Sequence, residues 1–174
     1  SQALVRALGD GPNDMTLGAL REEVFGGIRG PFGRLFPDLR MHDLGNPLVN
    51  GSFRFAKGIS SNFEYQNLSG GEKSAFDLVL DYVVKLVDYD NTVFCLDEPE
   101  AHVSPTLQGR LLRELYNLTS ESCQLWIATH SIGMLRAARD LARASPGTVM
   151  FLDFGAPDFD VATTMSPIVP SRAF

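Results

Sequence analysis

The chain has 174 residues, of which 44% are hydrophobic and 21% are charged, so it can form the core of one domain or a large part of one. The formal net charge of −6 argues against a protein that coats nucleic acid over its whole surface. Cys95 and Cys123 lack the spacing of a zinc site or a disulfide framework, and no apolar stretch approaches a membrane span. We therefore expect a cytoplasmic protein with reduced thiols.

The first third of the chain predicts one helix and two short strands. After a loop over residues 1–15, Thr16 is placed to cap a helix whose apolar residues recur at helical spacing, and Gly30-Pro31 is expected to end it. Alternating residues 52–55 predict a short strand, and a second strand is expected near residues 39–44.

The rest of the chain alternates helices and strands. Helices are predicted at 69–87, 105–118 and 132–144, the second with Ser104 as its cap and Pro105 at its first position. Apolar strands are predicted at 92–96, 125–129 and 148–152. This order indicates an α/β fold with a parallel sheet covered on both faces, followed by a tail or linker over residues 155–174.

The first motif that carries chemistry is L-S-G-G-E, residues 68–72. Ser69 and Glu72 have the spacing of a capping box at the start of a helix. Gly70 and Gly71 leave the helix amides bare, and the helix dipole favours an anion there. The motif is therefore either a phosphate site or only a capped helix after a flexible turn, and by itself it favours neither.

The second motif is V-F-C-L-D-E-P-E, residues 93–100. An apolar strand brings Asp97 and Glu98 to the carboxyl end of the sheet, where open α/β sheets bind ligands. Asp97 suits a magnesium ion, and Glu98 suits a general base that activates water in phosphoryl transfer. A strand that ends in a polar turn before a proline is the structural alternative.

The third motif is A-T-H-S, residues 128–131, at the end of the next strand. His130 is expected at the same edge of the sheet as Glu98, where it could donate a hydrogen bond to a terminal phosphate. Taken alone, a histidine that caps the following helix is the simpler interpretation.

Together, the order and spacing of the three motifs resemble the head domains of ABC-type ATPases. L-S-G-G-E resembles the ABC signature motif, the 93–98 segment resembles a Walker B strand with its catalytic glutamate, and T-H-S resembles the switch histidine. Residues 100–105 resemble the D-loop region of the OLD-type and RecF-like ATPases, which are relatives of the SMC proteins. The resemblance covers about residues 31–154 and implies a P-loop NTPase-like parallel sheet flanked by helices, with a short β-rich segment before it.

In that family two heads enclose two ATP molecules, so the resemblance implies a homodimer that binds ATP and Mg²⁺. Glu98 and His130 would be catalytic, and Asp97 would support the metal. The signature residues Ser69, Gly70, Gly71 and Glu72 would form the cofactor-binding set that meets the γ-phosphate from across the dimer, and residues 101–104 would cross the interface.

The Walker A pattern G-x-x-x-x-G-K-[ST] is missing from this sequence. The three lysines are Lys57, Lys73 and Lys85, and none of them follows a glycine. We therefore expect residues 1–30 to be a helical lead-in from a missing N-terminal lobe or arm. This chain alone should be inactive, or a separate chain should supply the Walker A lobe.

Several interpretations stay open beside the ATPase. The chain could be a non-catalytic interaction module that docks through its phosphate-binding helix. It could also be a nuclease or other hydrolase built on Asp97, Glu98 and His102, but the sequence offers no further ligands for such a site. The resemblance implies a role in DNA repair or antiphage defence, with DNA or a nuclease effector as partners and no membrane. The basic residues Arg34, Arg40, Arg54 and Lys57 could touch DNA, although a solvated sheet face explains them more simply.

Overall fold

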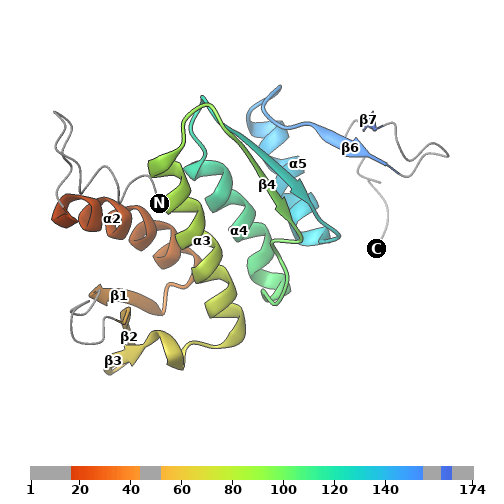
Figure 1. Cartoon of the computed structure of the whole chain (residues 1–174). Helices are drawn as coiled ribbons and strands as arrows, with labels where there is room; N and C mark the ends of the chain where they lie inside the picture. Colours follow the sequence, from red (N-terminus) through yellow and green to blue (C-terminus); the bar gives the residue numbers. More distant parts are fainter. Residues whose placement is uncertain (1–16, 44–51, 155–161, 166–174) are drawn as a thin grey trace, which may run out of the picture.

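The computed structural model describes residues 17–43, 52–154 and 162–165. Its elements in chain order are α2 (Leu17–Leu35), β1 (Leu39–Asp43), β2 (Arg54–Lys57), β3 (Ser60–Glu64), a 3₁₀ turn (Tyr65–Asn67), α3 (Gly70–Asp88), β4 (Val93–Asp97), α4 (Pro105–Leu118), β5 (Gln124–Ala128), α5 (Ile132–Ala144), β6 (Phe151–Asp153) and β7 (Thr163–Met165). Figure 1 shows α2 and the β1–β3 sheet at one end, the other helices with β4 and β5 in the middle, and β6–β7 projecting from the far end. The α/β class predicted from the sequence is confirmed.

Helix α2 does not end at Gly30-Pro31, so that prediction is wrong. It continues through Pro31 to Leu35, although an interior proline costs a helix about 3 kcal/mol. Ile28, Phe32 and Leu35 lie on both sides of the proline and are at most 1% exposed. Because burial of each such side chain is worth about 1.5–3 kcal/mol, tertiary packing outweighs the proline. Thr16, the predicted cap, lies outside the described residues.

A cluster of phenylalanines joins α2 to the small antiparallel sheet and to α3. The rings of Phe32, Phe55 and Phe76 are fully buried, and each pair of ring centroids is 5.1 or 5.5 Å apart. These separations allow favourable edge contacts between aromatic rings. The cluster fixes the start of α3, and with it the L-S-G-G-E segment, relative to the β1–β3 sheet.

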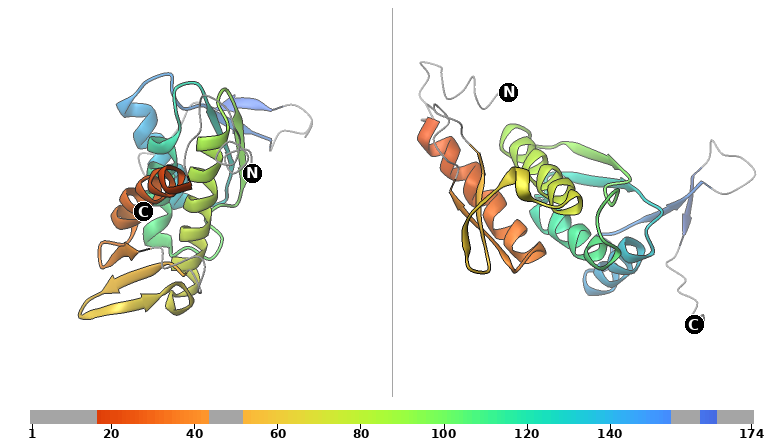
Figure 2. Two further views of the ribbon diagram at one scale, coloured as in Figure 1. Left: turned by 60° about the vertical axis from the view of Figure 1, so that its left-hand side comes forward. Right: turned by 90° about the horizontal axis from the view of Figure 1, so that it is seen from below.

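Strands β4 and β5 pair in parallel, in the register Val93 with Gln124 through Asp97 with Ala128. One face of the pair carries half-buried or buried residues such as Phe94, whose ring lies 4.9 Å from that of Tyr82 in α3. Figure 2 places α4 and α5 on one side of the pair. The two strands, which end at the candidate site, therefore pack against the core through one face only.

The prediction of a third parallel strand is wrong, and the predicted cover is present on only one face of the sheet among the described residues. Strand β6 pairs antiparallel with β7, and not with β5. On the second face of the β4–β5 pair, Val93 is 50% and Trp126 is 52% exposed. The apolar residues on both faces of these strands led to the prediction of full cover, but no described residue buries that second face.

The predicted helices after residue 67 are confirmed to within about one residue. Ser69 is the N-cap of α3, and Pro105 opens α4. Ser104 occupies the N-cap position of α4 but makes no side-chain cap bond, because its hydroxyl pairs with that of Thr106 at 3.0 Å. No helix among the described residues is long and apolar enough to cross a membrane.

Gly26 and Gly27, adjacent in α2, give a matched test of this packing. A Cβ added at Gly27 would lie 2.7 Å from Cγ1 of Val83, a stiff β-branched residue in α3, whereas Gly26 has no atom within 4 Å of that position. Gly27→Ala should lower the free energy of unfolding by about 1 kcal/mol, since overpacking exceeds the gain in helix propensity. Gly26→Ala should raise it by about 0.5–1 kcal/mol. Urea denaturation of both variants measures this, and equal effects would contradict the packing described.

Candidate functional site

The carboxyl ends of β4 and β5 deliver two polar loops to one edge of the parallel pair. Asp97 ends β4 opposite Ala128 of β5, and the amide of Glu98 donates to the Ala128 carbonyl at 2.9 Å. This bond extends the strand pairing by one residue. It places residues 98–100 directly beside residues 129–131.

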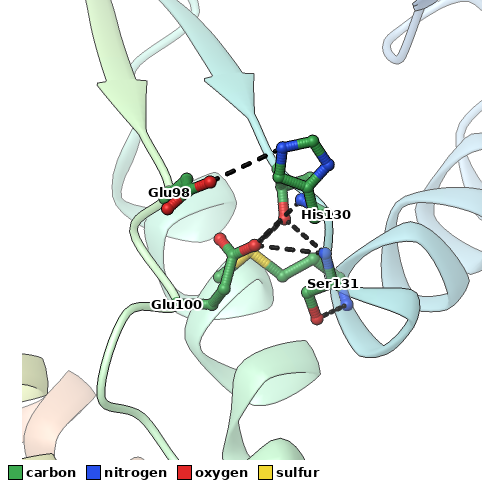
Figure 3. Close-up of polar contacts among 6 residues, drawn as sticks. Glu98, Glu100, His130 and Ser131 are labelled. Carbon is green, nitrogen blue, oxygen red and sulfur yellow. Dashed lines mark hydrogen bonds and ion pairs between the residues drawn. The ribbon is translucent and has the colours of Figure 1, made fainter.

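Glu98 and His130 meet at this edge, as predicted. Oε1 of Glu98 lies 3.5 Å from Nε2 of His130, and the two side chains are 57% and 90% exposed (Figure 3). Glu98 has φ of +45°, in the left-handed region that non-glycine residues rarely adopt. The carboxylate and the imidazole therefore face solvent together, free to contact a bound molecule.

His130 does not cap α5, so that alternative interpretation is wrong. Ser131 is the N-cap, and its Oγ accepts a hydrogen bond from the amide of Met134 at 3.1 Å. The same hydroxyl donates to Oε1 of Gln108 in α4 at 2.6 Å. The imidazole of His130 is not needed to complete the helix.

Asp97 is exposed at the end of β4, a position compatible with a metal ion that also takes waters and phosphates as ligands. Among the described residues, no group of three or more His, Cys, Asp or Glu side chains could hold a metal ion by itself. The metal-dependent hydrolase built on Asp97, Glu98 and His102 therefore gains no support. His102 instead adopts φ of +65° in the turn that follows Glu98.

The predicted capping box at the start of α3 is confirmed. Oγ of Ser69 accepts from the amide of Glu72 at 3.3 Å, and Oε2 of Glu72 accepts from the amide of Ser69 at 2.7 Å. The second oxygen of Glu72 accepts from Nζ of Lys57 in β2 at 2.9 Å. Glu72 is thus occupied within the chain, and its carboxylate does not face a ligand.

Burial opposes the charged form of Glu72, but the hydrogen bonds from Lys57 and Ser69 outweigh it and hold the pKa of Glu72 below its ordinary value. The hydrogen bond to Glu72 raises the pKa of Lys57. This ion pair fixes the N-terminus of α3 to the β1–β3 sheet.

The two glycines of the L-S-G-G-E segment have different surroundings. A Cβ at Gly71 would lie 2.9 Å from the carbonyl oxygen of His102, whereas Gly70 has nothing within 4 Å. Gly71 is therefore required by close packing against the turn over residues 98–103. This contact of Gly71 puts the start of α3 against the Glu98 turn, whereas Gly70 is the glycine that leaves open space at the helix N-terminus.

Sequence reasoning missed Lys57 and Glu100 as parts of this region. The sequence suggests only scattered basic charge at Lys57 and Arg34, but both residues form ion pairs. Lys57 pairs with Glu72, and Arg34 pairs with Glu114 of α4 at 2.7 Å. Glu100 contacts the His130 loop (Figure 3). The only signal for it was an acidic residue placed two positions after Glu98, within a turn.

A protein-family model matches residues 7–136, and its description is "AAA domain, putative AbiEii toxin, Type IV TA system". The match spans well over half of the chain. The chain belongs to this AAA domain family. None of the proteins with curated functions matches it.

Solved structures of SMC heads share the fold of this AAA domain. A chain from a study of ATP-driven dimerization and DNA-stimulated activation of SMC ATPases is 16% identical with a TM-score of 0.60, covering 84% of this chain and 85% of its own. An Smc head bound to the C-winged helix domain of ScpA is 17% identical with a TM-score of 0.53, covering 83% of this chain and 42% of its own. An Smc head from Pyrococcus furiosus, bound to the C-terminal domain of ScpA, is 19% identical with a TM-score of 0.50, covering 65% and 29%.

These matches establish a P-loop ATPase type of domain with the fold of an SMC head. At such low identity the structural matches show the fold alone. The AAA domain spans less than half the length of the two longer Smc heads.

The Lys57–Glu72 pair of the AAA domain predicts a pH-dependent stability. Because the pKa of Glu72 is lowered by folding, the ionised carboxylate stabilises the fold above its ordinary pKa of 4.5, and this contribution is lost as the pH falls through the lowered value. Glu72→Gln keeps the capping geometry and should be less stable by roughly 1 kcal/mol at pH 7. The difference should shrink below about pH 4.5.

The measurement is urea denaturation of both proteins between pH 7 and pH 3. Asp81→Asn is the matched control, since Asp81 pairs with Lys85 within the same helix but is exposed. It should change stability little at any pH. A deficit of Glu72→Gln that does not vary with pH would contradict the role of the ionised pair.

Proposed function

We propose that this chain is the signature-bearing part of an ATP-hydrolysing, dimeric ABC-type ATPase of the OLD/RecF/SMC-like group. The observation that carries the proposal is the meeting of Glu98 and His130, 3.5 Å apart at the ends of two parallel strands. The N-terminus of α3 lies against the same turn, through Gly71 and His102. All three predicted motifs therefore contribute to one region.

In this proposal Glu98 is the general base. Its exposed carboxylate takes a proton from water as the water oxygen bonds to the γ-phosphorus and the bond to the β–γ bridging oxygen breaks, which yields ADP and phosphate. His130 donates a hydrogen bond to the γ-phosphoryl oxygens. The contact between Glu98 and His130 keeps the base and the phosphate-sensing group at one position.

The chemical types of the residues in this region suit the binding of ATP and Mg²⁺. Asp97 supplies an exposed carboxylate, and one carboxylate can hold a magnesium ion when phosphates and waters complete its shell. The ion would neutralise charge on those phosphates. Ser69 and the bare amides near Gly70 suit the γ-phosphate of an ATP held by a second head. Gly71 and Glu72 hold the helix start in place, a narrower role than the resemblance implied.

The Walker A loop has to come from a lobe outside these 174 residues, in the same protein or in a separate chain. The open second face of β4–β5 supports such a lobe, because parallel strands are normally buried on both faces. The division at 1–30, 31–154 and 155–174 belongs to the same proposal, as does a role in DNA repair or antiphage defence with DNA or a nuclease effector as partner. A non-catalytic interaction module using the open face is the second candidate.

Replacing Glu98 tests the catalytic part of the proposal. In the full-length protein with its Walker A segment, Glu98→Gln should lower kcat by about 10²- to 10⁴-fold while ATP binding and the ATP-bound dimer persist. Glu121→Gln, an exposed glutamate in the turn after α4, is the matched control and should leave kcat unchanged. Phosphate release measures kcat, and light scattering measures the ATP-bound dimer. Undiminished turnover in Glu98→Gln would remove Glu98 from its role and favour the interaction module.

Replacing Gly70 tests the contact made across the dimer. Gly70→Asp places a negative charge where the γ-phosphate is proposed, and it should abolish ATP-dependent dimerisation, although an acidic residue in the first turn favours the helix itself. Gly70→Ala adds an uncharged methyl group in space that this chain leaves open, and it should weaken ATP-dependent dimerisation far less than Gly70→Asp. Sedimentation velocity with and without ATP compares them. Normal dimerisation of Gly70→Asp would show that this helix does not contact ATP in trans.

A further inference from the structure

Glu100 joins the two loops of the candidate site. It lies in the turn after β4, and its Oε1 accepts three hydrogen bonds from the segment that follows β5. The donors are the hydroxyl of Thr129, the amide of His130 at 3.1 Å and the amide of Ser131 at 3.1 Å (Figure 3). One carboxylate oxygen thus holds three consecutive residues.

These bonds are not needed to complete helix α5. The cap is already supplied by Ser131, and the two amides bound by Glu100 belong to the cap residue and the residue before it. An anion near a helix N-terminus is also favourable to the helix dipole, so the carboxylate and the helix stabilise each other. What Glu100 fixes specifically is the backbone from which the His130 side chain projects.

The Glu98–His130 contact needs such support. Both side chains are largely exposed, and an exposed ion pair or hydrogen bond at 3.5 Å holds its own geometry weakly. The direct bonds between the two loops, among described residues, are that of the Glu98 amide with Ala128 and those made by Glu100, and Gln108 of α4 adds an indirect link between Val103 and Ser131. The position of the imidazole relative to the Glu98 carboxylate therefore depends on Glu100.

We propose that Glu100 is a positioning residue that holds the His130 loop in register with Glu98 in the ATPase reaction. This inference rests on the proposed function. Glu100 touches neither the water nor the phosphate, and its effect on turnover passes through His130. Its second oxygen, Oε2, is buried and makes no hydrogen bond, so the clamp is made by one oxygen of the carboxylate.

The test compares Glu100→Ala and Glu100→Gln in the full-length protein. Glu100→Ala should lower kcat roughly 10- to 100-fold with KM for ATP nearly unchanged, as is typical when a group that orients a reactive residue is lost. Glu100→Gln keeps a carbonyl oxygen for the three donors, but its NH2 group takes the place of the buried Oε2 without an acceptor, so it should recover only part of that loss. If Glu100→Ala fails to fold, adding Glu100→Gln to His130→Ala should lower kcat no further, and a further loss would overturn the proposal.

A double variant separates positioning from general stability. If Glu100 acts through His130, adding Glu100→Ala to His130→Ala should lower kcat no further. Losses that multiply would show that Glu100 acts independently of His130 and would overturn the proposal. Wild-type kcat in Glu100→Ala would do the same.

Hydrogen exchange followed by mass spectrometry gives a reading that does not need activity. In Glu100→Ala, the amides of His130 and Ser131 should exchange faster, while the amide of Met134, bonded to Ser131, keeps its protection. Unchanged exchange at residues 130–131 would overturn the clamp. If the wild-type protein hydrolyses no ATP, the proposed function fails, and the exchange result still decides whether Glu100 holds this loop.

Discussion

The site depends on one tight turn, residues 98–103, which is packed between two other segments. On one side the carbonyl of His102 lies against Gly71 at the start of α3, and on the other side Glu100 binds the loop after β5. Glu98 and His102 both adopt positive φ, a conformation that costs of order 1 kcal/mol or more for a non-glycine residue. Such a conformation persists only where the surroundings fix it, and here contacts on both sides of the turn do so.

The turn reaches the rest of the fold through the helices. The start of α3 is fixed by the Lys57–Glu72 pair and by the buried ring of Phe76. Gln108 of α4 accepts from Ser131 and donates to the carbonyl of Val103 at 3.0 Å. The C-terminal end of the turn, at His102 and Val103, is thereby held by α3 and α4, whose buried residues form much of the core, so core packing and site geometry are not independent.

The sequence predicted the elements that carry strong local signals. The capping box of Ser69, the proline that opens α4 and the apolar strands gave α3, α4, β4 and β5 to within about one residue. It failed where long-range packing decides. Pro31 indicated a helix end, but the helix continues because its neighbours are buried, and the strand near residue 150 pairs with β7 instead of joining the parallel sheet.

The same contrast separates the polar residues of the motifs. Glu72 and Glu100 belong to the sequence motifs, yet their carboxylates accept hydrogen bonds from the chain itself. The side chains of Asp97, Glu98 and His130 are exposed instead. Spacing alone cannot distinguish the two kinds, since an acidic residue in a turn looks the same whether it holds a loop or faces a substrate. A motif of this type therefore contains its own supporting structure, and the residues exposed beyond that support are the ones available for chemistry.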